Sequence, residues 1–124
     1  MLFRSVAGCA RFELHQEALG SALGKAWLNI PEGFERNDGL ATLLPSNQRV
    51  QNRCEIKVTT LDEALGERQV ALLKLDIEGY EAEALKGAVG LLGRRQIENI
   101  LFEDHALGHG EAATILTEHG YDLF

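Results

Sequence analysis

The segment from residue 70 to residue 93 restricts the fold of this chain more than any other part of the sequence. Residues 70–77 are apolar almost without interruption, which predicts a strand buried on both faces, as in a parallel sheet. An acidic turn follows, and apolar residues then recur at the spacing of one helix face. They are Ala82, Leu85, Ala88, Val89 and Leu92. A buried strand that leads through an acidic turn into an amphipathic helix is typical of an α/β enzyme.

The rest of the second half continues this alternation. The apolar run at residues 97–102 predicts the next strand, so that strand, helix and strand form a βαβ unit. Residues 111–119 predict a further helix closed by Gly120, and residues 121–124 begin another strand. The second half is therefore expected to run β-α-β-α-β.

The first half is expected to be less regular. Residues 11–19 and 25–30 predict two strands joined by a turn, as a hairpin or a bent ribbon. A long loop follows at residues 31–53, and residues 55–60 alternate as a strand does. A short helix at residues 61–65 begins with a capping box made by its flanking Thr60 and by Glu63. We expect an α/β fold with a mainly parallel sheet and flanking helices.

Composition excludes several classes of function. A length of 124 residues favours one domain, and a net charge of −7 disfavours nucleic acid as a partner. No apolar run approaches the roughly 20 residues of a membrane span. Cys9 and Cys54 have neither the spacing of a zinc site nor that of a redox pair. These features predict a cytoplasmic protein with reduced thiols.

Two neighbouring strands are predicted to end in polar clusters, one at residues 76–81 and one at residues 103–105. Ligands of open α/β sheets bind beyond the carboxyl ends of the strands, so both clusters are expected to face one crevice. Asp76 is expected to be partly buried. It either positions a ligand or acts as a base, or it accepts hydrogen bonds from the first turn of the next helix. Lys74 either neutralises an acid of these clusters or extends into solvent from the sheet surface.

Two other ligand classes are compatible with these residues. Asp76 with Glu103, Asp104 and His105 could supply oxygen and nitrogen ligands to a metal ion. Residues 108–113 fit the pattern G-x-G-x-x-A of a dinucleotide site. The acidic residue that this pattern requires about 20 positions later is not present.

Three stretches, at residues 58–65, 72–88 and 97–103, resemble the FkbM family of S-adenosylmethionine-dependent methyltransferases. The most specific is Lys74-Leu-Asp-Ile-Glu-Gly-Tyr-Glu-Ala-Glu-Ala-Leu-Lys-Gly87, which fits K-x-D-x-E-G-x-E-x-x-x-L-x-G. The resemblance covers residues 11–124 and leaves residues 1–10 outside it. It implies a Rossmann-like class I fold that transfers a methyl group from S-adenosylmethionine, typically to a hydroxyl oxygen of a sugar or natural product.

The resemblance also implies roles for particular residues. Asp76 and Glu78 fall where the family places groups near the reacting methyl. The residues implied to bind the cofactor are Glu17, Ala18 and Gly79. The residues implied to face the small-molecule acceptor are Asn37, Gly39, Glu103 and His105. No metal is implied.

The chain departs from the family at its start, because the first strands and the glycine-rich turn that holds the cofactor are missing before residue 11. We therefore expect a truncated fold that binds S-adenosylmethionine weakly on its own. One alternative is a non-catalytic remnant, or a binding module completed by a partner or by self-association through an exposed sheet edge. A second alternative is a metal-dependent enzyme rich in carboxylates.

Overall fold

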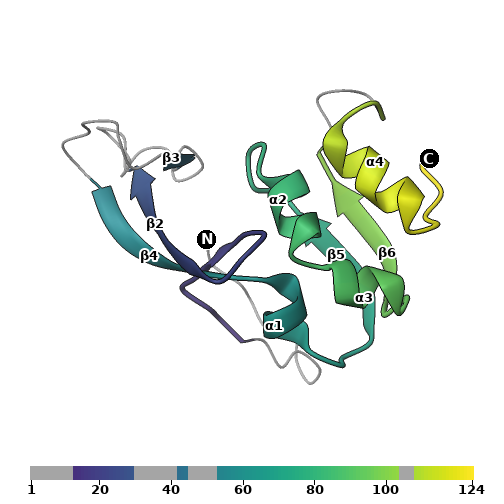
Figure 1. Ribbon diagram of the computed structural model, residues 1–124, viewed down its shortest axis with the longest axis horizontal. Helices are drawn as coiled ribbons and strands as arrows, with labels where there is room; N and C mark the ends of the chain where they lie inside the picture. The colour runs from purple at the N-terminus through teal and green to yellow at the C-terminus, as the bar shows by residue number, and fades with distance from the viewer. Residues whose placement is uncertain (1–12, 30–41, 45–52, 104–107) are drawn as a thin grey trace, which may run out of the picture.

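The computed structural model describes residues 13–29, 42–44, 53–103 and 108–124. Its second half contains the parallel strands β5 (Val70–Leu75) and β6 (Ile97–Phe102), which form a two-stranded sheet. Between them the chain runs through helices α2 (Glu81–Lys86) and α3 (Val89–Gly93), which confirms the βαβ unit (Figure 1). Helix α4 (Glu111–Glu118) follows β6, as the sequence predicts. The chain after it is coil, so the strand expected at residues 121–124 is wrong.

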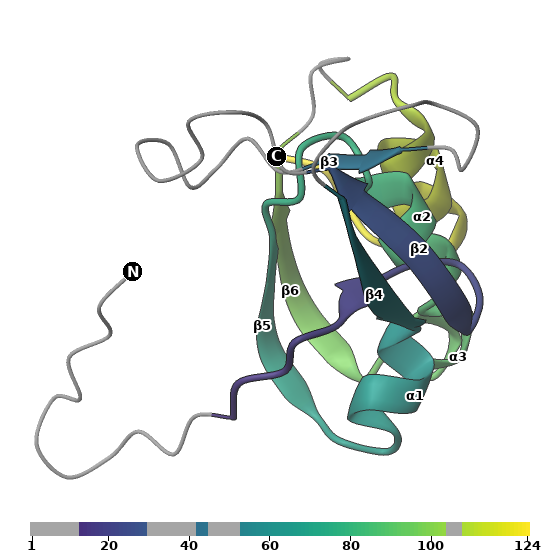
Figure 2. The same ribbon diagram turned by 90° about the vertical axis from the view of Figure 1, so that its left-hand side faces the viewer.

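The hydrophobic core lies between this small sheet and its helices. Figure 2 shows α2, α3 and α4 together on one side of β5 and β6. The buried core side chains come from α1, the β5–β6 sheet and these three helices, and the largest of them are fully buried. They are Leu85, Leu91, Leu92, Ile97 and Leu116. Burial of these side chains is the main favourable contribution to the stability of this half.

The opposite face of the sheet is open among the described residues. Leu72 is 60 % exposed and Leu101 is 56 % exposed. The expectation that the β5 strand is buried on both faces is therefore wrong. The apolar run indicates that a second layer could cover the open face of this strand, but the described helices all pack on the other face.

The regular pairing of the two strands is interrupted at one position along the sheet. The pairing register contains Val70 with Ile97 and Leu72 with Asn99, but it lacks a pair between Ala71 and Glu98. The Asn99 side-chain amide donates to the Ala71 carbonyl at 3.0 Å. This hydrogen bond supplies a partner to the carbonyl of a residue that the strand pairing skips.

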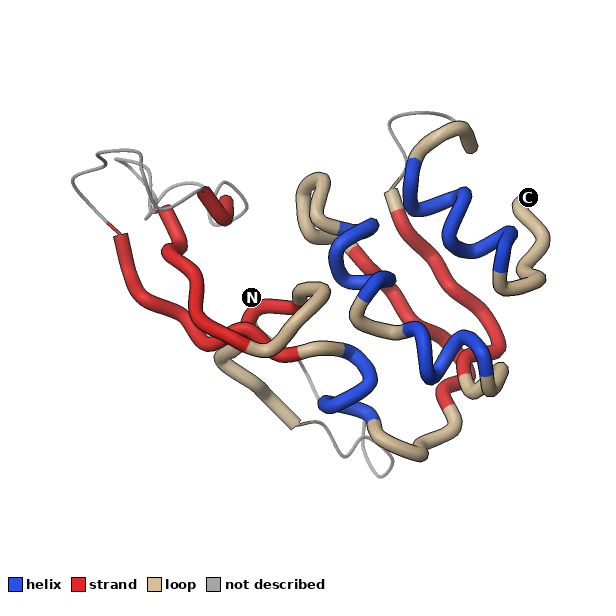
Figure 3. The backbone as a smooth tube through the Cα atoms, viewed as in Figure 1, coloured by secondary structure: helices blue, strands red, loops and turns tan. Residues whose placement is uncertain are grey.

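The predicted single helix at residues 81–93 is broken into α2 and α3, as Figure 3 shows. Gly87 ends α2, and its N–H donates to the carbonyls of Glu83 and Ala84. Because the axis breaks here, Val89 leaves the apolar stripe and is 53 % exposed, while Leu91 is fully buried instead.

The first half forms a separate mixed sheet of four strands. In order across the sheet these are β1 (Ala18–Leu19), β4 (Arg53–Thr59), β2 (Gly24–Asn29) and β3 (Thr42–Leu44). Strand β1 pairs with β4 in parallel, and β2 pairs with both β4 and β3 in antiparallel fashion.

This arrangement corrects four expectations. The hairpin of the first two strands is wrong, because β4 lies between β1 and β2. Within the described part of the strand predicted at residues 11–19, which starts at residue 13, only Ala18–Leu19 is strand. The expected loop at residues 31–53 contains β3. Two sheets therefore replace the single, mainly parallel sheet, and the described fold is mixed α/β with small sheets.

Helix α1 (Leu61–Leu65) joins the two halves. The Thr60 half of its predicted capping box is confirmed, because Thr60 Oγ1 accepts from the Glu63 N–H at 3.1 Å. The Asp62 carboxylate accepts from the N–H groups of Gly90 and Leu91 at 2.9 and 2.8 Å. These bonds satisfy the free N–H groups at the start of α3 and attach it to α1.

Candidate functional site

A pocket lies where β5 and β6 end. Its volume is about 310 Å³, and six residues line it, three from each strand end. They are Lys74, Leu75, Asp76, Leu101, Phe102 and Glu103. The parallel register explains this grouping, because Lys74 lies beside Leu101 and Leu75 beside Phe102. The two acids predicted to share one crevice, Asp76 and Glu103, therefore line the same pocket.

The environment of Asp76 differs from the sequence expectation. Its side chain is 56 % exposed, so the prediction of partial burial is wrong. Strand β5 ends one residue earlier, at Leu75, and Asp76 already belongs to the loop. Lys74 Nζ donates to Asp76 Oδ2 at 3.1 Å, and the lysine side chain is itself exposed. Lys74 thus fulfils both alternatives predicted for it, because it pairs with an acid and its side chain also extends into solvent.

The turn after Asp76 has an unusual backbone. Glu78 has φ +53° and Gly79 has φ +94°, both in the left-handed region. Glycine adopts that conformation without steric cost, whereas a side chain at residue 78 is strained by it. A Cβ atom at Gly79 would meet nothing within 4 Å, so glycine is needed here for its backbone angle rather than for space. Glu78, expected to be catalytic, is exposed on this turn and does not line the strand-end pocket.

Glu81 holds this turn in place. The sequence places it in the polar cluster at residues 76–81, yet it is only 5 % exposed. Its Oε1 atom accepts from the Ile77 N–H at 3.2 Å. A buried carboxylate is costly without such partners, and an acid in the first turn of a helix is also favoured by the helix dipole. Glu81, and not Asp76, is therefore the buried carboxylate at this turn, and it accepts from the Ile77 N–H before the helix rather than from the first turn of the helix.

The residues implied to bind the adenine side of a cofactor lie in the other sheet. Glu17 directly precedes β1, and its Oε1 atom pairs with Lys57 Nζ at 2.5 Å. Ala18 is in β1 beside Val58 of β4. Neither residue lines the strand-end pocket, so the structure does not bring Glu17 or Ala18 together with Asp76, whereas Gly79 lies on the turn that follows Asp76.

Some predicted residues lie outside the described ranges. They are Asn37, Gly39, Asp104 and His105. The proposed metal ligands Asp104 and His105 are therefore not placed. Within the described ranges, the structure contains no group of three or more His, Cys, Asp or Glu side chains arranged to hold a metal ion.

Sequence reasoning missed the apolar part of the pocket. Leu75, Leu101 and Phe102 form its walls, although all three read as ordinary core residues. The pairing of two predicted parallel strands was the signal that could have found them, since residues level with Lys74 and Leu75 must lie near the same end. The site thus combines apolar walls with two carboxylates and one ammonium group, a combination suited to an uncharged polar molecule.

Comparison with known proteins adds one finding. A family model described as "Methyltransferase FkbM domain" matches residues 8–123, which is nearly the whole chain. Comparison with curated proteins gives no match, and comparison with solved structures gives none either. Of the helices described, none is long and apolar enough to cross a membrane.

Proposed function

This chain belongs to the FkbM methyltransferase family, and we propose that it transfers a methyl group from S-adenosylmethionine to a hydroxyl oxygen of a sugar or natural product. The observation that carries the proposal is the strand-end pocket, in which carboxylates from two parallel strands meet. Its place at the carboxyl ends of β5 and β6 is where open α/β sheets bind ligands. S-adenosylmethionine, when bound, supplies an activated methyl group.

The side chains of the pocket suit the task of holding an acceptor hydroxyl. Asp76 is exposed at the pocket wall, and its carboxylate can accept a hydrogen bond from that hydroxyl. Lys74 restricts the carboxylate by bonding to one of its two oxygens, which leaves the other for a ligand. Leu101, which is 56 % exposed, and Phe102 provide the apolar surface against which the carbon skeleton of a sugar packs. Correct orientation of the hydroxyl is the contribution we assign to these residues.

The described residues fit the acceptor side of a methyltransferase better than the cofactor side. The Glu17 carboxylate, implied to flank the adenine, is already paired with Lys57. Gly79 lies on the turn after β5 with open space around its Cα. We therefore assign no contact with S-adenosylmethionine to Glu17 or Ala18, and we expect binding of the cofactor by this chain alone to be weak.

The Asp76→Asn variant tests the proposal. Transfer of labelled methyl from S-adenosylmethionine to a panel of methyl glycosides is measured for the wild type and for the variant. If Asp76 orients the acceptor, kcat/KM falls about 100-fold, the loss expected when a reacting group is misplaced. Calorimetric titration with S-adenosylmethionine should give the same affinity for both proteins, because Asp76 is placed on the acceptor side.

Asp122→Asn is the matched control, since Asp122 is also an exposed aspartate and does not line the strand-end pocket. It should leave transfer unchanged. Equal activity of Asp76→Asn and the wild type would show that Asp76 does not orient the acceptor. Binding of S-adenosylmethionine without transfer to any glycoside of the panel would contradict the proposed acceptor class.

A further inference from the structure

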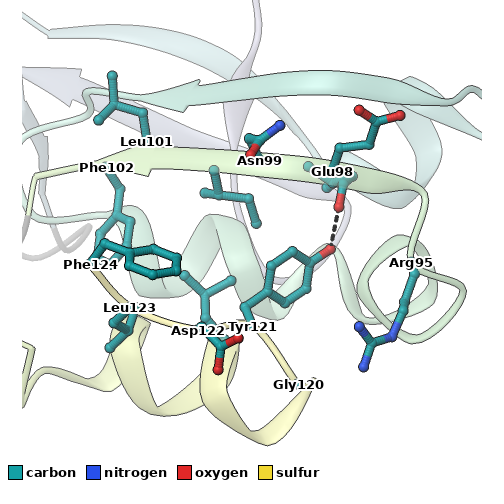
Figure 4. A pocket seen from close by; sticks show the side chains of 13 residues that line it. Arg95, Glu98, Asn99, Leu101, Phe102, Gly120, Tyr121, Asp122, Leu123 and Phe124 are labelled. Carbon is teal, nitrogen blue, oxygen red and sulfur yellow. Dashed lines mark hydrogen bonds between the residues drawn. The ribbon is translucent and has the colours of Figure 1, made fainter.

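A groove runs along the outer edge of β6. Its volume is about 610 Å³, and it is lined by all six residues of Ile97–Phe102 on one side and by residues 120–124 on the other. Figure 4 shows the side chains of both walls, with the Tyr121 hydroxyl donating to the Ile97 carbonyl at 2.6 Å. A groove lined by every residue of one strand follows the edge of that strand, which is the shape that an added strand fills.

The β5–β6 sheet lacks neighbours among the described residues. It has two strands, which are parallel, and its helices lie on one face. Parallel sheets are normally larger and covered on both faces. Apolar side chains are also exposed around the edge, namely Leu101 of β6 and Leu123 of the opposite wall. An edge strand with exposed apolar neighbours favours pairing with another strand.

The charges at the two ends of β6 indicate which strand pairs with it. Arg94 and Arg95 precede the strand, and Glu103 follows it. Arg95 lines the groove at its beginning, and Glu103 lies at the opposite end, where it lines the strand-end pocket. In an antiparallel pair of two β6 strands, the basic end of each would lie beside the acidic end of the other. The edge is thus complementary to itself, although the chain as a whole carries a charge of −7.

We propose that a second copy of this chain binds in this groove, with the two β6 strands paired antiparallel about a two-fold axis. The pairing joins two small sheets into one of four strands, which satisfies main-chain groups at both edges. Leu123 and Phe124 of each copy then cover the β6 strand of the partner subunit. This inference does not depend on the proposed methyl transfer.

Light scattering and sedimentation velocity over a range of protein concentrations measure the mass of the protein in solution and so test whether two copies pair. The wild type should form a dimer. Arg95→Glu and Glu103→Arg should each raise the dimer dissociation constant about tenfold, because every reversal acts twice in a symmetric dimer. The double variant Arg95→Glu/Glu103→Arg should recover most of the affinity, since it restores opposite charges across the two-fold axis.

Two controls distinguish the β6 edge from other surfaces of the chain. The swap Lys25→Glu/Glu55→Arg exchanges an ion pair between β2 and β4 and should leave the dimer unchanged. Leu101→Lys should weaken the dimer, whereas Leu14→Lys, at an exposed leucine before β1, should not. Circular dichroism confirms that each variant is folded. A monomer at every concentration overturns the proposal, and so does a dimer that none of the β6 variants weakens.

Discussion

Asp76 and Glu81 lie five positions apart and occupy environments opposite to those their sequence context indicates. Asp76 follows an apolar run and is exposed, while Glu81 is on the charged side of an amphipathic pattern and is buried. The difference follows from the end of β5 at Leu75 and from the left-handed turn at Glu78 and Gly79. That turn directs the side chain of Glu81, the first residue of α2, back towards the Ile77 N–H. Single residues at a strand end are thus placed by the turn and not by the periodicity around them.

Tyr121 provides a test at the same scale, because burial raises the pKa of its hydroxyl above the ordinary 10.0, while the charge of Arg95 lowers it by less. The neutral hydroxyl donates to Ile97 in the folded state. A raised folded pKa contributes stability that is complete below pH 10 and is lost as the pH rises through the folded value. Tyr121→Phe should cost about 1 kcal/mol at pH 8.

Urea unfolding at pH 8 and at pH 11 measures this effect. The wild type should lose more free energy of unfolding between these pH values than Tyr121→Phe does. An equal loss in both proteins would mean that Tyr121 does not contribute to the alkaline transition.

At the scale of elements, close packing around the break between α2 and α3 determines how the two halves join. A Cβ atom on Gly87 would lie 2.2 Å from the Gly20 carbonyl oxygen and 3.1 Å from Cβ of Thr60. The Gly87 carbonyl also accepts from the Asp62 N–H at 2.9 Å. The backbone between α2 and α3 therefore packs directly on the segments that lead into β2 and α1.

Gly87→Ala should destabilise the protein by about 1–3 kcal/mol, as overpacking does. Gly93→Ala is the matched control, because a Cβ atom at Gly93 meets nothing within 4 Å and its φ is not positive. It should stabilise the protein by about 0.4–1 kcal/mol through the entropy of the unfolded chain. Thermal unfolding of both variants measures the difference, and equal midpoints would contradict the close packing around Gly87.

A salt-bridged cluster links α2 to α4. Lys86 Nζ lies 2.6 Å from Glu83 Oε1 and 3.0 Å from Glu111 Oε1. The hydrogen bond from Lys86, and then that from Ser21, hold the pKa of Glu83 below 4.5. The stabilisation is therefore present above about pH 4.5 and is lost as the pH falls through the lowered value. Because these groups are mostly exposed, the contribution is small.

For the whole molecule, the distribution of the core predicts unequal stability. Among the residues whose side chains the structure describes, every buried side chain of the core belongs to Leu61 or to a residue after it, and none comes from β2 or β4. The mixed sheet extends away from that core in Figure 1. Regions with few buried apolar contacts open at lower free energy than the core does.

Amide hydrogen exchange should therefore be at least about tenfold slower in β5 and β6 than in β2 and β4. Mass spectrometry of peptides from the two sheets measures the ratio. Equal protection of both sheets would show that they unfold as one cooperative unit and would contradict the separation of the core.

The sequence by itself determined the order of the elements from β5 to α4. The βαβ unit, α4, the cap of α1 and the meeting of Asp76 with Glu103 were all predictable, because they depend on local periodicity and on the rule that parallel strands end at one edge. The family was also recognisable from the block around Lys74–Gly87. Most of these depend on residues close together in the sequence, and the meeting of Asp76 with Glu103 follows from the parallel order of β5 and β6.

Only the tertiary structure decided how strands far apart in sequence pair and which side chains are covered. Nothing in the periodicity of β2 shows that β4 lies between it and β1, since β-strand pairing is a contact between distant segments. Likewise, an apolar run indicates that a strand can be buried. Whether Leu72 and Leu101 are exposed depends on which layers of the fold cover their strands. The burial of Glu81 and the exposure of Asp76 have the same origin, because solvent access is a property of the assembled fold.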